Sequence, residues 1–160
     1  MHRLVQAFVP FVILGGCSAT RSGAGVKDDA ISIGHGYKVH IKDQKLVVDK
    51  GDKRAYEYLR FAYLEYPIPD EFLYYAMVMA NKYDDAQGCY DTFDILVSMH
   101  RNIQDIDSNT ANVAVMYLLK AYRKKHHQAV PAVESHSVVY DEATNREQLI
   151  RMRGIRPQTP

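Results

Sequence analysis

The chain has 160 residues, of which 47% are hydrophobic and 24% charged, and its formal net charge is +1. This length and composition are typical of one globular domain and exclude a disordered or collagen-like chain. Two cysteines exclude a disulfide framework and a four-thiolate zinc site. The near-neutral charge argues against a nucleic-acid partner, because nucleic-acid binders carry a basic surface.

The N-terminus has the features of a secretory signal. The basic segment 1–3 precedes the apolar stretch Leu4–Leu14, which is too short for a membrane-spanning helix of about 20 residues. The small residues Gly15 and Gly16 follow, and then Cys17. We expect residues 1–16 to be a signal peptide. The alternative is a buried N-terminal helix.

The run Leu14-Gly15-Gly16-Cys17 resembles the lipobox of bacterial lipoproteins, in which leucine and two small residues precede the lipidated cysteine. The resemblance implies that Cys17 becomes the mature N-terminus and carries covalent acyl chains, which anchor the chain to a membrane. In such lipoproteins, aspartate after the cysteine often signals retention in the inner membrane. Ser18 at this position implies sorting to the outer membrane, provided that the host is Gram-negative. No other cofactor is expected.

The next two segments are predicted to be a tether and a β-hairpin. Residues 17–30 combine the lipidated cysteine with small polar residues typical of a flexible tether. Residues 31–50 are predicted to form the hairpin, because apolar and polar residues alternate over 37–41 and Leu46–Val48 suits a returning strand. Residues 31–33 are a candidate third strand.

Residues 51–160 are predicted to form a helical body with a basic C-terminal tail, because apolar residues recur every three or four positions. Pro131 is expected to break the chain, and residues 138–140 form a strand-like patch. The expected helices cover 52–66, 69–83, 84–97, 108–125 and 141–153. The predicted fold class is therefore mainly α, with antiparallel hairpins of four to five helices and a small N-terminal β-hairpin.

Residues 70–96 resemble a tetratricopeptide repeat. The segment 82–86 is similar to its turn, and Tyr90 and Phe93 follow at the spacing of its second helix. The resemblance implies two closely packed helices. The motif departs at Tyr74, where the family has Gly or Ala, and no second copy follows 34 residues later. A generic α-helical hairpin is the alternative.

No motif points to a metal or a reaction. Asp105, Asp107 and Asn109 match the first positions of an EF-hand loop, but Met116 stands where that loop has its chelating glutamate. Asp107, Ser108 or Asn109 is therefore expected to cap the following helix. Cys89 lies in an apolar helical stripe and is expected in the core. We expect no metal site, no catalytic residue and no enzyme activity.

Tyrosine is the most distinctive residue type, since eight of the twelve lie within residues 56–90. Because tyrosine is favoured at protein interfaces, we expect a protein-binding surface at Tyr63, Tyr66, Tyr74 and Tyr75. The alternative is that these rings close a small core.

Charge is segregated along the chain, with +3 in residues 17–60, −7 in residues 61–110 and +4 in residues 111–160. Two explanations fit this pattern. Either the basic end folds over the acidic helices, or the charged surfaces dock onto a partner.

Together these features predict a non-enzymatic lipoprotein of the cell envelope, anchored at the periplasmic face of the outer membrane. It would bind an envelope protein and assist the assembly of an envelope or secretion complex. In architecture this role resembles that of helical pilotin-type lipoproteins. The alternatives are a lipoprotein that binds envelope glycan or peptidoglycan, and a cryptic enzyme.

Overall fold

The computed structural model describes residues 30–33, 37–65 and 69–154, which form a mainly helical body with a small antiparallel sheet. The predicted fold class is confirmed. The strands are β1 (Ala30–Ile33) and β2 (Tyr37–His40). The helices are α1 (Ile41–Lys50), α2 (Lys53–Glu65), α3 (Pro69–Lys82), α4 (Ala86–Ser98), the short 3-10 helix η1 (Ile103–Asp105), α5 (Ser108–Arg123), α6 (Ala129–His136) and α7 (Asn145–Gly154).

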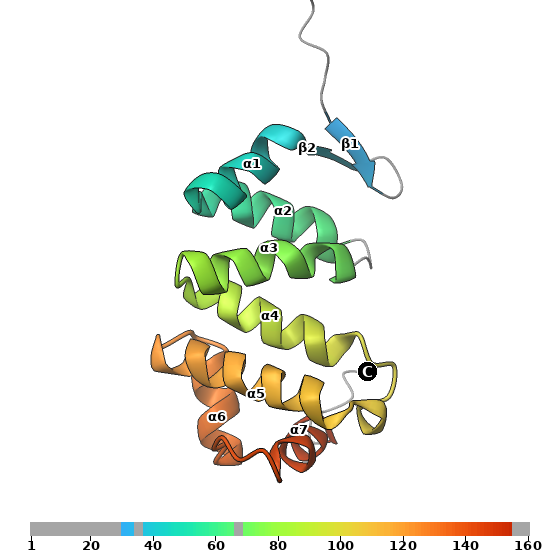
Figure 1. The fold of residues 1–160 in the computed structure, drawn as a ribbon, viewed down its shortest axis with the longest axis vertical. Helices are drawn as coiled ribbons and strands as arrows, with labels where there is room; N and C mark the ends of the chain where they lie inside the picture. The colour runs from blue at the N-terminus through green and yellow to red at the C-terminus, as the bar shows by residue number, and fades with distance from the viewer. Residues whose placement is uncertain (1–29, 34–36, 66–68, 155–160) are drawn as a thin grey trace, which may run out of the picture.

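The helices α1 to α5 follow one another along the length of the molecule (Figure 1). The strands lie at the α1/α2 end of this stack, and α6 and α7 lie at the other end. The central helix α4 packs most extensively against α3 and α5. The position of α4 therefore fixes how the two halves of the stack meet.

The β-hairpin differs from the prediction in which strands pair. β2 lies at the predicted first strand and β1 covers the candidate third strand, residues 31–33. β1 pairs with β2 in antiparallel register, with Ala30 opposite His40. The returning strand predicted at Leu46–Val48 is wrong, because these residues lie within α1. A continuous apolar run does not distinguish a strand from a buried helical turn. Gly51 ends this helix, since its N–H donates to the Val47 carbonyl at 3.0 Å.

The helices pair into three consecutive hairpins, α1/α2, α3/α4 and α5/α6, whose connecting turns are equivalent. Each turn has a residue in the left-handed region: Gly51 at φ 63°, Asp84 at φ 53° and Lys125 at φ 57°. Only the first of these is a glycine, which permits this backbone conformation without steric cost. The three hairpins therefore share one way of reversing the chain.

In the first two hairpins, the residue after the left-handed position, Asp52 or Asp85, caps the following helix with its carboxylate. In the third, the ring nitrogen Nδ1 of His126 accepts from the N–H of Gln128, the residue just before α6. The acceptors receive hydrogen bonds from the N–H groups of Ala55 (2.8 Å), Gly88 (3.0 Å) and Gln128 (3.4 Å), respectively. A side-chain acceptor at this place satisfies a backbone donor that the helix itself leaves unpaired.

Three residues after each of these acceptors comes a small, buried residue: Ala55, Gly88 and Ala129. Small residues here let the second helix of a hairpin approach the first. The approach is closest at Gly88, where an added Cβ would lie 2.6 Å from the Met79 Cβ and 2.8 Å from the Ala80 nitrogen.

The C-terminal region departs from prediction at two places. Pro131 does not break the chain but lies in the first turn of α6, where its missing N–H costs no helical hydrogen bond. Residues 138–140 do not form a strand. Gln148 of α7 holds this segment by accepting from the Val139 N–H at 3.1 Å and donating to the Val139 carbonyl at 2.9 Å.

Some of the opposite charges that are separated along the sequence pair with one another in the folded protein. Lys120 and Lys124, from the basic third of the sequence, form ion pairs with Asp84 of the acidic middle. Lys120 also donates to the Ala80 carbonyl at 2.7 Å. The basic end thus folds against the acidic helices at the α3/α4 turn, as one of the two explanations requires.

We predict that Gly88→Ala lowers the free energy of unfolding by about 2 kcal/mol, because the added methyl must displace the backbone of α3 rather than a mobile side chain. Denaturant unfolding followed by circular dichroism measures the change. Ser98→Ala, at an exposed position of the same helix, is the matched control. A Gly88→Ala protein as stable as this control would contradict the packing described.

Candidate functional site

The four tyrosines predicted at a binding surface have different environments. Tyr74 is 56% exposed on α3, and its neighbour Tyr75 is partly buried. Tyr63 of α2 is only 3% exposed, so it belongs to the core. Tyr66 lies outside the described residues, as does Cys17. Two of the four side chains, Tyr74 and Tyr75, therefore reach a surface that a partner can contact.

Tyr74 and Tyr75 form one wall of an open groove of about 240 Å³ between α1 and α3. The opposite wall comes from α1, which the sequence analysis assigned to a strand. It consists of Ile41, Gln44, Lys45, Val48 and Asp49. The groove therefore combines apolar and aromatic side chains with one cationic and one anionic side chain.

The two tyrosine rings of the groove belong to a series of aromatic rings in contact, which extends into the core. The Tyr74 ring meets Tyr75 edge-on, with centroids 5.3 Å apart, and Tyr75 stacks on Tyr63 at 6.0 Å. Tyr63 stacks on Phe72 at 6.0 Å, and Phe72 stacks on Tyr56 at 5.3 Å. Ring pairs at these separations are favourable beyond the area they bury. A partner would thus meet a surface that is already rigid.

The Tyr75 hydroxyl of this groove and the Tyr63 hydroxyl beneath it stay protonated at neutral pH. Burial raises the pKa of Tyr75 to about 12, and burial together with the negative charge of Glu71 raises the pKa of Tyr63. The Gln44 amide donates to the Tyr63 hydroxyl at 3.5 Å. Tyr75 therefore offers the groove a neutral hydroxyl that can form hydrogen bonds rather than a phenolate anion.

Asp91 is the centre of a buried polar cluster behind the groove. Its carboxylate accepts hydrogen bonds from the Tyr56 hydroxyl at 2.8 Å, from Gln87 Nε2 at 2.9 Å and from Arg60 Nε at 3.0 Å. Burial raises the pKa of Asp91, although the Arg60 cation and these hydrogen bonds act against the rise. The Gln87 Oε1 is 2.9 Å from His126 Nε2. The cluster thus connects all three hairpins.

An open, polar cleft of about 390 Å³ lies where the turns of the stack meet. Lys53 is paired with Asp85 at 2.7 Å, and Lys124 is paired with Asp84. Two of the cations that line the cleft are therefore already neutralised within the protein. The remaining lining charges include Glu57 and Lys125. We assign the cleft a structural role at the turns.

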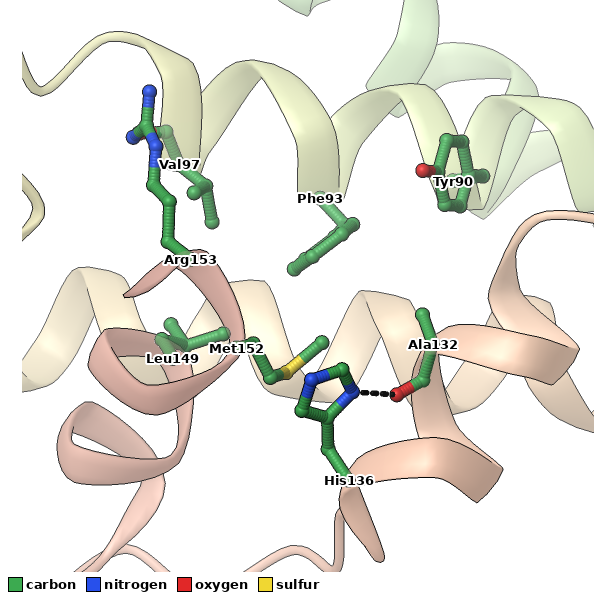
Figure 2. A pocket seen from close by; sticks show the side chains of 8 residues that line it. All are labelled: Tyr90, Phe93, Val97, Ala132, His136, Leu149, Met152 and Arg153. Atoms are coloured by element: carbon green, nitrogen blue, oxygen red, sulfur yellow. Dashed lines mark hydrogen bonds between the residues drawn. The ribbon is translucent and has the colours of Figure 1, made fainter. Parts of the chain in front are cut away.

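A smaller cavity of about 120 Å³ lies between α4, α6 and α7 (Figure 2). Its walls are mostly apolar, and Arg153 closes one end. The Arg153 guanidinium donates to the Val97 carbonyl at 2.6 Å, and His136 Nδ1 is 3.0 Å from the Ala132 carbonyl. These polar groups are used within the fold. The volume is also well below the roughly 300 Å³ at which ligand pockets begin.

Two further assignments from the sequence are confirmed. Asp107 caps α5, because its Oδ1 accepts from the N–H groups of Asn109 at 2.9 Å and Thr110 at 3.0 Å. Cys89 is fully buried in α4, and burial raises the pKa of its thiol. Within the described ranges, no group of three or more His, Cys, Asp or Glu residues is placed to hold a metal ion.

The α1 wall of the groove was missed in the sequence analysis. The signal that identifies it is Gly51 followed by Asp52, a helix end followed by a helix cap, as at the α3/α4 turn. That pair requires a helix before residue 51 and thus places the apolar residues of 41–48 on a helical face.

Comparisons with protein-family models, with curated proteins and with solved structures found no match to this chain. In the part of the chain that the structure describes, no helix is both long and apolar enough to cross a bilayer.

We predict that the protein loses stability as the pH falls below about 6.5, the ordinary pKa of histidine. Burial, and then the positive charges of His127 and Arg60, lower the pKa of His126 in the folded state, while Asp85 opposes them. The unfolded chain therefore binds a proton that the folded chain resists. The free energy of unfolding therefore decreases as the pH falls from 6.5 to the lower pKa of His126 in the folded protein, and it decreases no further from this cause below that pKa.

Denaturant unfolding between pH 8 and pH 5.5 measures this slope. His126→Asn should make the free energy of unfolding less dependent on pH over this range. His127→Asn, at an exposed neighbouring position, should leave most of the pH dependence in place. Parallel profiles for the wild-type protein and His126→Asn would show that His126 does not carry the pH dependence.

Proposed function

We propose that this chain is a non-enzymatic lipoprotein, anchored by acyl chains on Cys17 at the periplasmic face of the outer membrane. Its helical body binds another envelope protein and assists the assembly of an envelope or secretion complex. The observation that carries the binding role is the groove between α1 and α3, where the exposed ring of Tyr74 lies beside partly buried Tyr75.

The shape of the groove favours a protein partner over a small ligand. The groove is open along α1 and α3 rather than enclosed, and pockets for small molecules bury most of their ligand. Its wall includes two tyrosine rings, and tyrosine is enriched among the residues that dominate binding energy at protein interfaces. A side chain from a partner segment fits such a surface.

The rigidity of the groove also supports binding. Tyr74 and Tyr75 are backed by the rings of Tyr63 and Phe72, so little conformational freedom remains to be lost on association. The side chains on α1 supply a cation at Lys45 and an anion at Asp49 beside the rings. Such charges contribute to specificity and orientation more than to affinity.

The three equivalent turns support a repeat-like body. We propose that α1/α2, α3/α4 and α5/α6 are tetratricopeptide-like units, because each has a left-handed turn residue, a side-chain acceptor and a small buried residue at the same relative positions. Three units are the number that such stacks normally need for stability. The interval from Gly51 to Asp84 is one residue shorter than the 34-residue repeat of that family. The interval from Asp84 to Lys125 is longer than the repeat, because η1 is inserted between α4 and α5.

Glycan binding remains the second candidate, since the exposed Tyr74 ring offers a face on which a sugar can stack. The same variants discriminate the two functions if binding to purified peptidoglycan is measured alongside binding to proteins.

We predict that Tyr74→Ala weakens partner binding at least tenfold, because a central aromatic side chain at an interface is commonly worth about 2 kcal/mol. The measurement is quantitative co-purification of the tagged, full-length protein from cross-linked membranes of the cells that make it. Tyr140→Ala is the matched control, since Tyr140 is similarly exposed, at 49%, on the segment that precedes α7.

The expected result is a set of envelope proteins retained by the wild-type protein and by Tyr140→Ala but lost with Tyr74→Ala. An unchanged set would remove the groove as the binding surface. A loss of peptidoglycan binding alone would assign the groove to glycan.

A further inference from the structure

The two ends of the helical stack differ in whether their apolar side chains are covered. At the C-terminal end, α7 packs against α5 and α6. At the N-terminal end, the outer face of α2 exposes three large apolar side chains: Tyr58 at 41%, Phe61 at 55% and Leu64 at 37%. Helical repeat stacks normally need a polar outer face on their terminal units. The exposed face of α2 therefore needs an explanation.

The strands share this surface with α2. The Tyr58 hydroxyl donates to the Lys38 carbonyl of β2 at 2.8 Å, and the Tyr58 ring stacks on His40 at 6.5 Å. Ile31 of β1 is also exposed. The outer face of α2 and the hairpin thus form one surface at the N-terminal end of the stack (Figure 1). We call it the hairpin-end face.

We propose that the hairpin-end face lies against the phospholipid bilayer, with Phe61 and Leu64 entering its interfacial region. This inference rests on the proposed lipid anchor at Cys17. Twelve residues, 18–29, separate that cysteine from β1. A chain of this length spans at most about 40 Å even when fully extended. The anchor would therefore hold the hairpin end of the stack within about 40 Å of the membrane.

The chemistry of the face suits a bilayer surface. A tyrosine ring is favoured at the level of the headgroups, while phenylalanine and leucine are favoured below them. Arg54 and Glu57 are both exposed on α2 at helical spacing to these side chains, so they lie on the same side of the helix. The Glu57 carboxylate forms an ion pair with Arg60 at 3.9 Å, which leaves Arg54 to contact anionic headgroups. The sequence from Cys17 to Arg60 carries +3, which favours an anionic lipid surface.

The apolar part of this face is small. It consists of three side chains from one helix and one from a strand. A weak contact is sufficient at a bilayer, because the anchor already supplies a high effective concentration.

The absence of tryptophan from the sequence makes the test direct, since Phe61→Trp introduces a single fluorescent reporter. The full-length mature protein is extracted from membranes, its acyl mass is checked, and it is reconstituted into vesicles of phosphatidylethanolamine and phosphatidylglycerol. Parallel vesicles contain brominated lipid, which quenches tryptophan only within the bilayer. Val139→Trp, at an exposed site near the α7 end, is the matched control.

We expect brominated lipid to reduce Phe61→Trp fluorescence at least twofold and to shift its emission to the blue, with little effect on Val139→Trp. Circular dichroism establishes that both variants fold. If the protein floats with the vesicles but Phe61→Trp is not quenched, the inference is wrong while the anchor stands. A blue shift without quenching would assign the face to a second copy or another protein. A protein without acyl mass that does not float would overturn the anchor and this inference together.

Discussion

The carboxylate of Asp91 is the contact on which the arrangement of the hairpins depends. It receives hydrogen bonds from Tyr56 and Arg60 of the first hairpin and from Gln87 of its own helix, and Gln87 continues to His126 of the third. Loss of this carboxylate would leave Arg60 without its buried partner, which costs several kcal/mol in comparable pairs. The cluster also lies on α4, where the apolar core of α1–α3 meets that of α4–α7. The angle between the two halves of the stack is therefore set at a polar contact with directional requirements, rather than by apolar packing alone.

The proposed binding groove and the polar cluster belong to one connected structure. Tyr56 donates to Asp91 with its hydroxyl and stacks on Phe72 with its ring, and the stacked rings continue from there to Tyr74 at the surface. A surface backed in this way keeps its shape without a partner, which reduces the entropy lost on binding. The proposed membrane contact uses a different face, the exposed side of α2. The two proposals therefore place the membrane and the protein partner on separate surfaces of one rigid body.

Helical periodicity was sufficient to predict α2, α3, α4 and α5, because each buries a stripe of residues spaced by three and four. Helix α7 was predicted from the glycine at residue 154, which ends it. Periodicity failed at α1, where a continuous apolar run carries no period, and at α6, where Pro131 was taken as a break although a first-turn proline is tolerated. Half of the groove was missed with α1. The burial of Tyr63 was accessible from the sequence, since Tyr63 lies two turns after the buried Tyr56 on one helix. The third hairpin was not recognised because His126 stands where the other two turns have an aspartate, and because η1 lengthens the interval before it.

The proposed role depends on the covalent lipid at Cys17, since both the location of the body and the contact of its hairpin end with the bilayer follow from that anchor. Intact mass spectrometry of the protein, extracted from the cells that make it, tests this claim most directly, with Cys17→Ser as the comparison. The account predicts a mature chain of 144 residues that begins at Cys17, carries acyl chains and fractionates with the outer membrane, whereas Cys17→Ser carries no acyl mass and is not retained there. A wild-type chain that keeps residues 1–16, or begins elsewhere without lipid, would contradict the account.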